Sequence, residues 1–187
     1  MDAITADDHR TDNTLLRLAV AGDEAAFVEL YRRRHGPLYR FALHMSGSAA
    51  VAEEVTQEVF MALIRKPGAF DPQRGPLAGF LYGVARNHVL RCLERERRFV
   101  GLEDNPAEAT VMGDLTRSET IGAVRQAVLS LPADYREVVV LCDLQELPYA
   151  EAAGVLGVPV GTVRSRLSRG RALLEDKLRA RSERCLT

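Results

Sequence analysis

The sequence predicts an all-α fold of two small helical domains, an N-terminal helical bundle and a C-terminal helix-turn-helix domain, joined by a flexible acidic linker. Apolar residues recur at helical spacing in almost every segment, and no stretch convincingly alternates apolar and polar residues as a half-buried strand does. An exposed linker is indicated by "VGLEDNPAEATVMGDLTR", which holds four acids against one arginine, one proline and two glycines. The predicted domains are residues 12–98 and 118–182, and the linker is residues 99–117.

The composition indicates a soluble globular protein. Hydrophobic residues make up 47% of the 187 residues and charged residues 27%, which is too apolar for a disordered chain, and no apolar run is long enough to span a membrane. The polar start "MDAITADDHRTDN" is unlike a signal peptide, so we expect a cytoplasmic protein without membrane insertion. The three cysteines form no CxxC pair and the histidines show no metal-ligand spacing, so we expect no metal and no cofactor.

The net charge of −1 conceals a strong asymmetry. Residues 1–30 carry seven acids against two arginines, whereas residues 160–184 carry eight bases against three acids. A second basic block at residues 86–98, "RNHVLRCLERERR", carries five arginines against two glutamates. Two separate basic patches on a nearly neutral chain indicate two contacts with a polyanion, although solvated helix faces are the alternative for either patch alone.

One clear amphipathic helix is predicted in "AVAEEVTQEVFMALIRK". Its apolar positions fall on one face, which we expect to face the core: Val51, Val55, Val59 and Leu63. An acidic outer face is formed by Glu53, Glu54, Gln57 and Glu58. Taken alone, such a face is more often solvated than part of a binding site.

The next helix is predicted in "LAGFLYGVARNHVLRCLERERR", residues 77–98. Its inward positions are Leu77, Leu81, Val84, Ala85 and Cys92. The outer half carries an aromatic ring, an asparagine and several arginines, at Phe80, Gly83, Arg86, Asn87, Leu90, Arg91, Glu94 and Arg97. Aromatic rings stack on bases and arginines attract phosphates, so this strip suits single-stranded nucleic acid.

A helix-turn-helix is predicted in "LPYAEAAGVLGVPVGTVRSRLSRGRALL". The first helix runs from about Pro148 to Leu156, Gly157 provides the tight turn, and Pro159 favours the start of the second helix. On that second helix the inward face comprises Val163, Leu167, Gly170 and Leu174. The opposite face and its flanks suit the major groove and the phosphates beside it: Arg164, Ser165, Arg166, Ser168, Arg169, Arg171 and Ala172. An ordinary amphipathic surface helix is the alternative.

Three stretches and their order resemble the extracytoplasmic-function (ECF) sigma factors, of the sigma-70 class of bacterial RNA polymerase initiation factors. The stretches are "AEEVTQEVFMAL", "FDPQRGPLAGFLYGVARNHVLRCLERERR" and "LPADYREVVVLCDLQELPYAEAAGVLGVPVGTVRSRLSRGRALL". The resemblance implies an alternative sigma factor rather than an enzyme. Such a protein binds core RNA polymerase, recognises the −35 and −10 promoter elements and promotes open-complex formation. The resemblance also implies control by an anti-sigma factor and a role in stress response.

The resemblance assigns roles to particular residues. Docking on the coiled coil of the beta-prime subunit is implied for Glu53, Glu54, Gln57 and Glu58, with a further contact of the C-terminal domain to the beta flap. Recognition and melting of the −10 element are implied for Phe70, Arg74, Phe80, Arg86, Asn87, Arg91 and Arg97, with an extruded base beside residues 69–75. Recognition of the −35 element is implied for Thr162, Arg164, Ser165, Arg166, Ser168, Arg169 and Arg171.

The sequence departs from the family pattern at three positions. Phe80 stands where the family usually has tryptophan, Pro148 where a serine N-cap is common, and Ala152 where a larger aliphatic residue often packs. A smaller ring still permits base stacking. The other two departures concern stability more than contact.

Three other functions are alternatives to this interpretation. A helix-turn-helix repressor or response-regulator output domain explains residues 148–174 but leaves residues 77–98 and the acidic helix without a role. An enzyme is disfavoured because the sequence has no P-loop, no HExxH and no strand followed by GxGxxG. A sigma-like protein that mainly engages a regulator remains open.

Overall fold

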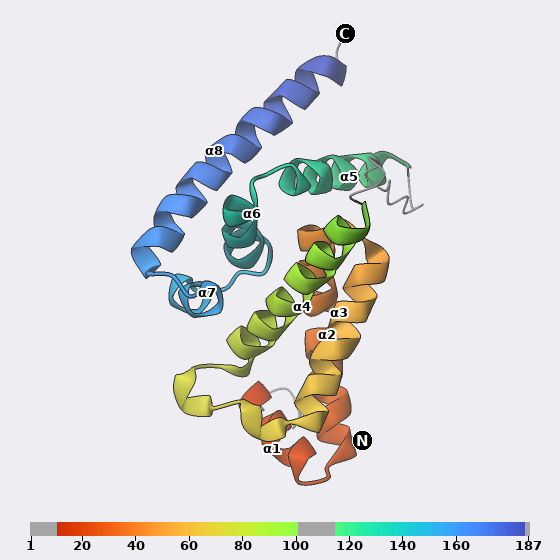
Figure 1. Ribbon diagram of the computed structural model, residues 1–187, viewed down its shortest axis with the longest axis vertical. Helices are drawn as coiled ribbons and strands as arrows, with labels where there is room; N and C mark the ends of the chain where they lie inside the picture. The colour runs from red at the N-terminus through yellow and green to blue at the C-terminus, as the bar shows by residue number, and fades with distance from the viewer. Residues whose placement is uncertain (1–10, 101–114, 186–187) are drawn as a thin grey trace, which may run out of the picture.

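The computed structural model describes residues 11–100 and 115–185, and this part of the chain contains helices and turns but no strand (Figure 1). The all-α prediction is therefore confirmed. The N-terminal domain comprises α1 (Asp12–Val20), α2 (Glu24–Ser46), α3 (Ala49–Arg65) and α4 (Leu77–Val100). The C-terminal domain comprises α5 (Leu115–Leu129), α6 (Ala133–Val139), the π-helical turn η3 (Val140–Leu144), α7 (Tyr149–Leu156) and α8 (Val160–Cys185).

Side-chain caps fix where the first three helices begin. The Oγ1 of Thr11 accepts from the backbone N–H of Thr14 at 3.3 Å, and the carboxylate of Asp23 accepts from that of Ala26 at 3.0 Å. Ser48 caps α3 in the same way. Such caps satisfy backbone donors that have no partner within the helix.

The segment between α3 and α4 is folded into two single turns of 3-10 helix, η1 (Pro67–Ala69) and η2 (Pro72–Arg74). Asp71 accepts a hydrogen bond from the backbone N–H of Gln73 at 2.9 Å and so starts the second turn. The side chain of Asn13, from α1, accepts from the backbone N–H of Leu77 at 3.0 Å. This long-range cap ties the start of α4 to the first helix and fixes the loop in front of it.

The segment "REVVVLCDL" contains the only β-branched run in the sequence, and it folds as a buried helix. Val138, Val139, Val140 and Leu141 are fully buried at the centre of the C-terminal domain. The helix widens into the π-helical turn η3 at Val140–Leu144, and α7 follows after a short loop. The run therefore supplies the wall against which α8 packs.

The two domains pack together rather than standing apart. α5 and η3 lie against α2, and α7 lies against α4, so that the apolar residues of both domains form one continuous core. In Figure 1, α8 extends beyond the other helices toward the C-terminus. The end of α4 at Val100 and the start of α5 at Leu115 make residues 99–100 and 115–117 of the predicted linker helical. The rest of the predicted linker lies outside the described residues.

Candidate nucleic-acid interface

The helix-turn-helix of the C-terminal domain forms as the sequence predicts. α7 ends at Gly157, which has a φ of +67° and lies in the left-handed region that favours glycine. Along α8, Val163 is fully buried and Leu167 is 2% exposed. A Cβ atom on Gly170 would lie 2.9 Å from Cγ2 of Val139, so α8 approaches α6 as closely as it does because this residue is glycine.

The opposite face of α8 is open to solvent. The exposed predicted −35 residues on it are Arg164, Ser165, Ser168, Arg169 and Arg171. Thr162 and Arg166 are half-buried. The hydroxyl of Ser165 donates to the carbonyl of Thr162 at 3.0 Å, which holds the short side chain close to the helix. An exposed face of short side chains and long arginines fits the major groove of duplex DNA.

The four arginines at the start of α8 divide into two pairs. Arg166 donates to Asp134 at 2.7 Å, and Arg171 donates to both carboxylate oxygens of Asp143 at 3.0 and 2.6 Å. The hydrogen bonds that Arg171 donates to Asp143, together with the negative charge of that carboxylate, raise the pKa of Arg171 above its usual value. Neither Arg164 nor Arg169 forms an ion pair with any described residue, so both guanidinium groups are available to a ligand.

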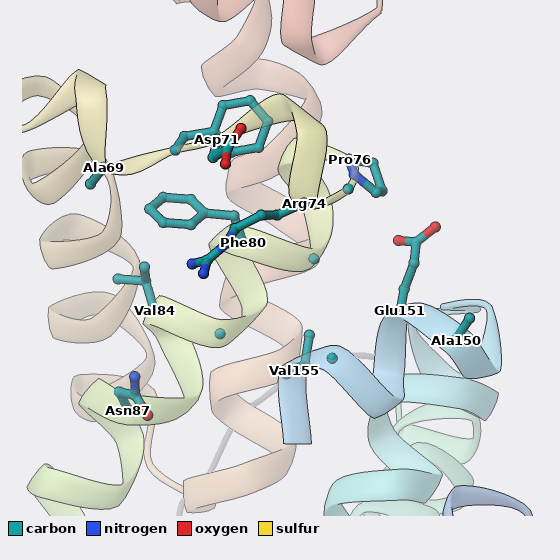
Figure 2. A pocket seen from close by; sticks show the side chains of 15 residues that line it. Ala69, Asp71, Arg74, Pro76, Phe80, Val84, Asn87, Ala150, Glu151 and Val155 are labelled. Carbon is teal, nitrogen blue, oxygen red and sulfur yellow. The ribbon is translucent and has the colours of Figure 1, made fainter. Parts of the chain in front are cut away.

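Four of the predicted −10 residues line a hollow of about 650 Å³ in front of α4: Phe70, Arg74, Phe80 and Asn87 (Figure 2). The rings of Phe70 and Phe80 lie 5.6 Å apart at an angle of 57°. Arg74 extends from η2 beside Phe80, and the exposed amide of Asn87 lies one turn beyond Val84 on α4. The hollow thus combines an aromatic pair, a cation and an amide, which are the groups that hold an unpaired base.

Three further predicted −10 residues have different environments. Arg91 is exposed on α4, as predicted. Arg97 belongs to the same helix, but its side chain lies outside the described residues. Arg86 was predicted on the exposed strip, yet it is only 23% exposed and forms an ion pair with Glu137 of α6. The difference arises because the C-terminal domain covers this part of α4.

The contact between the domains uses residues that the sequence analysis did not identify. The hydroxyl of Tyr82 on α4 donates to the side-chain oxygen of Gln145 at 3.0 Å. Arg136 of α6 donates to the backbone carbonyl of Met45 at 2.9 Å. Helical periodicity gives the direction of each side chain on its own helix but not which distant helix it meets. Only the tertiary structure could identify these pairs.

The acidic face of α3 is exposed above a buried stripe, as predicted. Val51, Val55, Val59 and Leu63 are all at most 5% exposed. On the outer face, Glu54 pairs with Arg95 of α4 at 3.1 Å and Glu58 lies 3.9 Å from Arg65. Glu53 and Gln57 are exposed and have no ion pair or side-chain hydrogen bond with a described residue. On the outer face of α3, these two side chains are therefore the ones without a polar partner among the described residues.

Two other features bear on the chemistry of the chain. Cys92 is buried beside Glu54. Burial is the main cause that raises the pKa of its thiol, and the negative charge of Glu54 raises it further, so the thiol stays protonated at neutral pH. Within residues 11–100 and 115–185, no three metal-ligating side chains come together. None of the helices described there has both the length and the apolar character needed to cross a membrane.

Comparisons with known proteins identify both domains. The family profile Sigma-70 region 2 matches residues 30–99, and the profile Sigma-70, region 4 matches residues 121–174. The ECF RNA polymerase sigma factor SigE of Mycolicibacterium smegmatis is 38% identical over 167 residues, which are 84% of this chain and 64% of that protein. The ECF RNA polymerase sigma factor SigM of Mycobacterium tuberculosis is 35% identical over 88% of this chain and 83% of its own length.

Solved structures share the fold. The sigma factor RpoE of Bartonella quintana, in complex with the anti-sigma factor NepR, superposes with a TM-score of 0.73 at 24% identity over 82% of this chain and 96% of that one. CnrH, in complex with the cytosolic domain of CnrY, gives a TM-score of 0.70 at 29% identity over 90% of this chain and 97% of that one. Sigma factors are transcription initiation factors rather than enzymes. A lone helix-turn-helix repressor would leave the region 2 match unexplained. The chain belongs to the ECF sigma factors of the sigma-70 class.

Proposed function

We propose that this protein directs core RNA polymerase to promoters by reading a −35 element with α8 and an opened −10 element with α4. The observation that carries the proposal is the exposed face of α8, where Arg169 stands among short serines with no ionic partner in the described part of the chain. A free guanidinium in that position can donate two hydrogen bonds to the edge of a guanine. Arg164 lies on one flank of this face, has no ionic partner among the described residues, and is suited to a backbone phosphate.

At the −10 element, the hollow in front of α4 suits a base extruded from the non-template strand. Phe80 offers a ring for stacking, and Asn87 offers an amide that can both donate and accept hydrogen bonds. Arg74, exposed at the rim, is placed to attract the phosphate of the same nucleotide. Base stacking and phosphate neutralisation together favour the opened strand over the duplex.

Binding to polymerase is assigned to the acidic face of α3. Glu53 and Gln57 are exposed there, and Glu54 and Glu58 extend the negative surface. We assign this face to the coiled coil of the beta-prime subunit and the C-terminal domain to the beta flap, as the sequence resemblance implies. A second protein partner is also part of the proposal, because CnrH is solved with the cytosolic domain of CnrY and the resemblance implies an anti-sigma factor. The protein is then active in the cytoplasm.

Run-off transcription tests the proposed function. Purified core RNA polymerase is incubated with a library of promoter fragments, with and without this protein, and transcripts are sequenced. Defined transcripts that require the protein support the proposal and reveal both promoter elements. If the protein yields no transcript but alone retards duplex DNA, it is a repressor instead.

A matched pair of variants tests the polymerase contact. Glu53→Lys reverses a charge on the acidic face and should weaken core binding, measured by co-elution with polymerase and by loss of run-off product. Glu24→Lys reverses an exposed charge on α2, outside both proposed polymerase contacts, and serves as the control. Equal core binding by the two variants contradicts the assignment of α3.

A further inference from the structure

An arginine on the exposed side of α8 is held by an acid from another element. Nε and Nη2 of Arg171 donate to the two carboxylate oxygens of Asp143 at 3.0 and 2.6 Å. The side chain of Arg171 is 55% exposed and that of Asp143 is 26% exposed, so the pair lies at the surface rather than in the core. Two parallel hydrogen bonds fix the plane of the guanidinium as well as its position. The cation is thereby directed toward the protein, although it is open to solvent.

The held arginine lies on the same flank of α8 as a free one. Arg164 and Arg171 are seven residues apart, which is close to two helical turns and about 10 Å along the axis. Each strand of duplex DNA carries a phosphate about every 3.4 Å of its axis, so both arginines could meet one backbone. Arg166, whose partner is Asp134, is half-buried on the opposite flank. Arg171 is therefore the paired arginine whose release would add a phosphate contact.

The packing of α8 does not depend on this ion pair alone. Val163 and Leu167 anchor the helix in the core, and Gly170 lies directly against α6. Ion pairs at the surface contribute little to stability, because water screens them and both side chains lose freedom. Asp143 belongs to the π-helical turn η3, and such turns are frequent at functional sites. The main effect of the pair is therefore on the charge that α8 presents.

We propose that Asp143 limits the sequence-independent part of promoter affinity, by keeping Arg171 off the DNA backbone. The inference rests on the proposed function, because it takes α8 as the helix that enters the major groove. An arginine on a phosphate strengthens binding to every sequence alike, whereas an arginine on a base strengthens binding to the matched sequence only. While Arg171 is held, a promoter with a poor −35 element gains no backbone contact in compensation. Occupancy then depends on base contacts such as that proposed for Arg169.

Asp143→Asn tests the proposal through the salt dependence of DNA binding. Asparagine keeps the size of the side chain but offers one oxygen acceptor and no charge, so Arg171 is released. One further phosphate contact should steepen the fall of log affinity with log salt concentration by about 0.9. The gain in affinity should be the same for matched and mismatched −35 elements, and it should shrink about 3.5-fold between about 50 and 200 mM salt.

The measurement uses holoenzyme reconstituted from core RNA polymerase and the full-length chain. It is titrated onto two fluorescein-labelled duplexes, a promoter found by run-off transcription and the same promoter with a mismatched −35 element. Fluorescence anisotropy at several salt concentrations gives the slope for each variant. A steeper slope is a readout that a purely structural ion pair does not produce, since loss of such a pair lowers only the urea midpoint of unfolding.

Three further variants make the result specific to this pair. Glu146→Gln removes an exposed acid three residues beyond Asp143 that has no ion pair with a described residue, and it should keep the wild-type slope. The double variant Asp143→Asn/Arg171→Gln should also return to the wild-type slope, because the released cation is gone. Arg171→Lys keeps the charge but cannot form two parallel hydrogen bonds, so it should steepen the slope as well. It decides the question if Asp143→Asn loses its helical circular dichroism.

A wild-type slope for a folded Asp143→Asn overturns the proposal, because Arg171 is then not kept from the backbone by this acid. A steeper slope that persists in the double variant also overturns it, since the gain then comes from the lost negative charge alone. Failure of the proposed function looks different: holoenzyme with the wild-type chain then binds the matched and mismatched duplexes equally and yields no run-off product.

Discussion

At the scale of single residues, the arginines of α8 divide between structure and recognition. Arg166 and Arg171 hold α8 to α6 and to the π-helical turn through Asp134 and Asp143. Arg164 and Arg169 have no such partners among the described residues. A substitution at an arginine with an acidic partner changes both packing and DNA contact, whereas one at Arg169 changes contact alone. Arg169 therefore gives the clearest test of base readout.

Arg169→Ala should lower discrimination between matched and mismatched −35 elements by roughly 1–3 kcal/mol, because a bidentate contact to one base is lost. The measurement is run-off transcription from promoters that differ at single −35 positions. Arg179→Ala removes an arginine further along the same helix, where it pairs with Glu175, and should keep the wild-type ratio. A wild-type ratio for Arg169→Ala itself excludes this residue as a base reader.

Asn87→Ala should impair use of the −10 element and leave −35 discrimination intact, because the exposed amide lines the hollow in front of α4. A lost base contact is expected to cost about 1–3 kcal/mol in open-complex formation. Permanganate reactivity of unpaired thymines on single −10 variants measures the opened strand. Gln126→Ala removes an exposed amide from α5 and is the control. Equal reactivity of the two variants on every template argues against the assignment.

At the scale of elements, one glycine determines how α8 packs. Gly170 lies against Val139 and Tyr135 of α6, where an added Cβ would come within 2.9 Å of the valine side chain and 3.4 Å of the backbone carbonyl of Tyr135. Because Val139 is fully buried, this part of α6 has little room to move away. The angle at which α8 presents its arginines depends on this contact.

Gly170→Ala should destabilise the chain by about 1–3 kcal/mol through overpacking, although alanine is the better helix former. Gly154→Ala is the matched control, because Gly154 is exposed in the middle of α7. A Cβ atom added there would have no atom of the described residues within 4 Å. It should stabilise by about 0.5–1 kcal/mol. Urea unfolding followed by circular dichroism compares the two, and a stabilising Gly170→Ala contradicts the packing argument.

The elements that the sequence predicted best are those whose signals are local. The stripe of Val51, Val55, Val59 and Leu63 and the left-handed turn at Gly157 were both predictable, because each depends on residues a few positions apart. The π-helical turn at Val140–Leu144 was not, because a run of buried apolar residues has no periodicity of its own. The position of Arg86 was missed for another reason: its partner, Glu137, lies 51 residues along the chain in the other domain.

At the scale of the whole molecule, the two domains share one core and one set of polar contacts. Arg136 is central, because it donates to the carbonyl of Met45 in the N-terminal domain at 2.9 Å and to those of Leu129 and Leu131 in its own domain, the last at 3.0 Å. One side chain thus satisfies carbonyls at the ends of two helices. The domains should therefore unfold as a single unit.

Arg136→Met should lower the free energy of unfolding by about 2–4 kcal/mol, because buried carbonyls lose a charged donor while the apolar volume is kept. It should also split the single unfolding transition into two, since the link to Met45 is lost. Urea titration with circular dichroism measures both effects. Arg32→Met replaces an exposed arginine on α2 and should have little effect. One unshifted transition for Arg136→Met shows that other contacts couple the domains.

The ion pair between Arg86 and Glu137 has a consequence for how output depends on protein abundance. Both partners belong to one polypeptide, so their local concentration is fixed by the chain and not by the number of copies in the cell. A separate inhibitor is exhausted once its target outnumbers it, and that stoichiometry sets a threshold. An ion pair within one chain forms in the same fraction of molecules at every copy number. The Arg86–Glu137 pair therefore introduces no threshold into the relation between transcription and the amount of protein made.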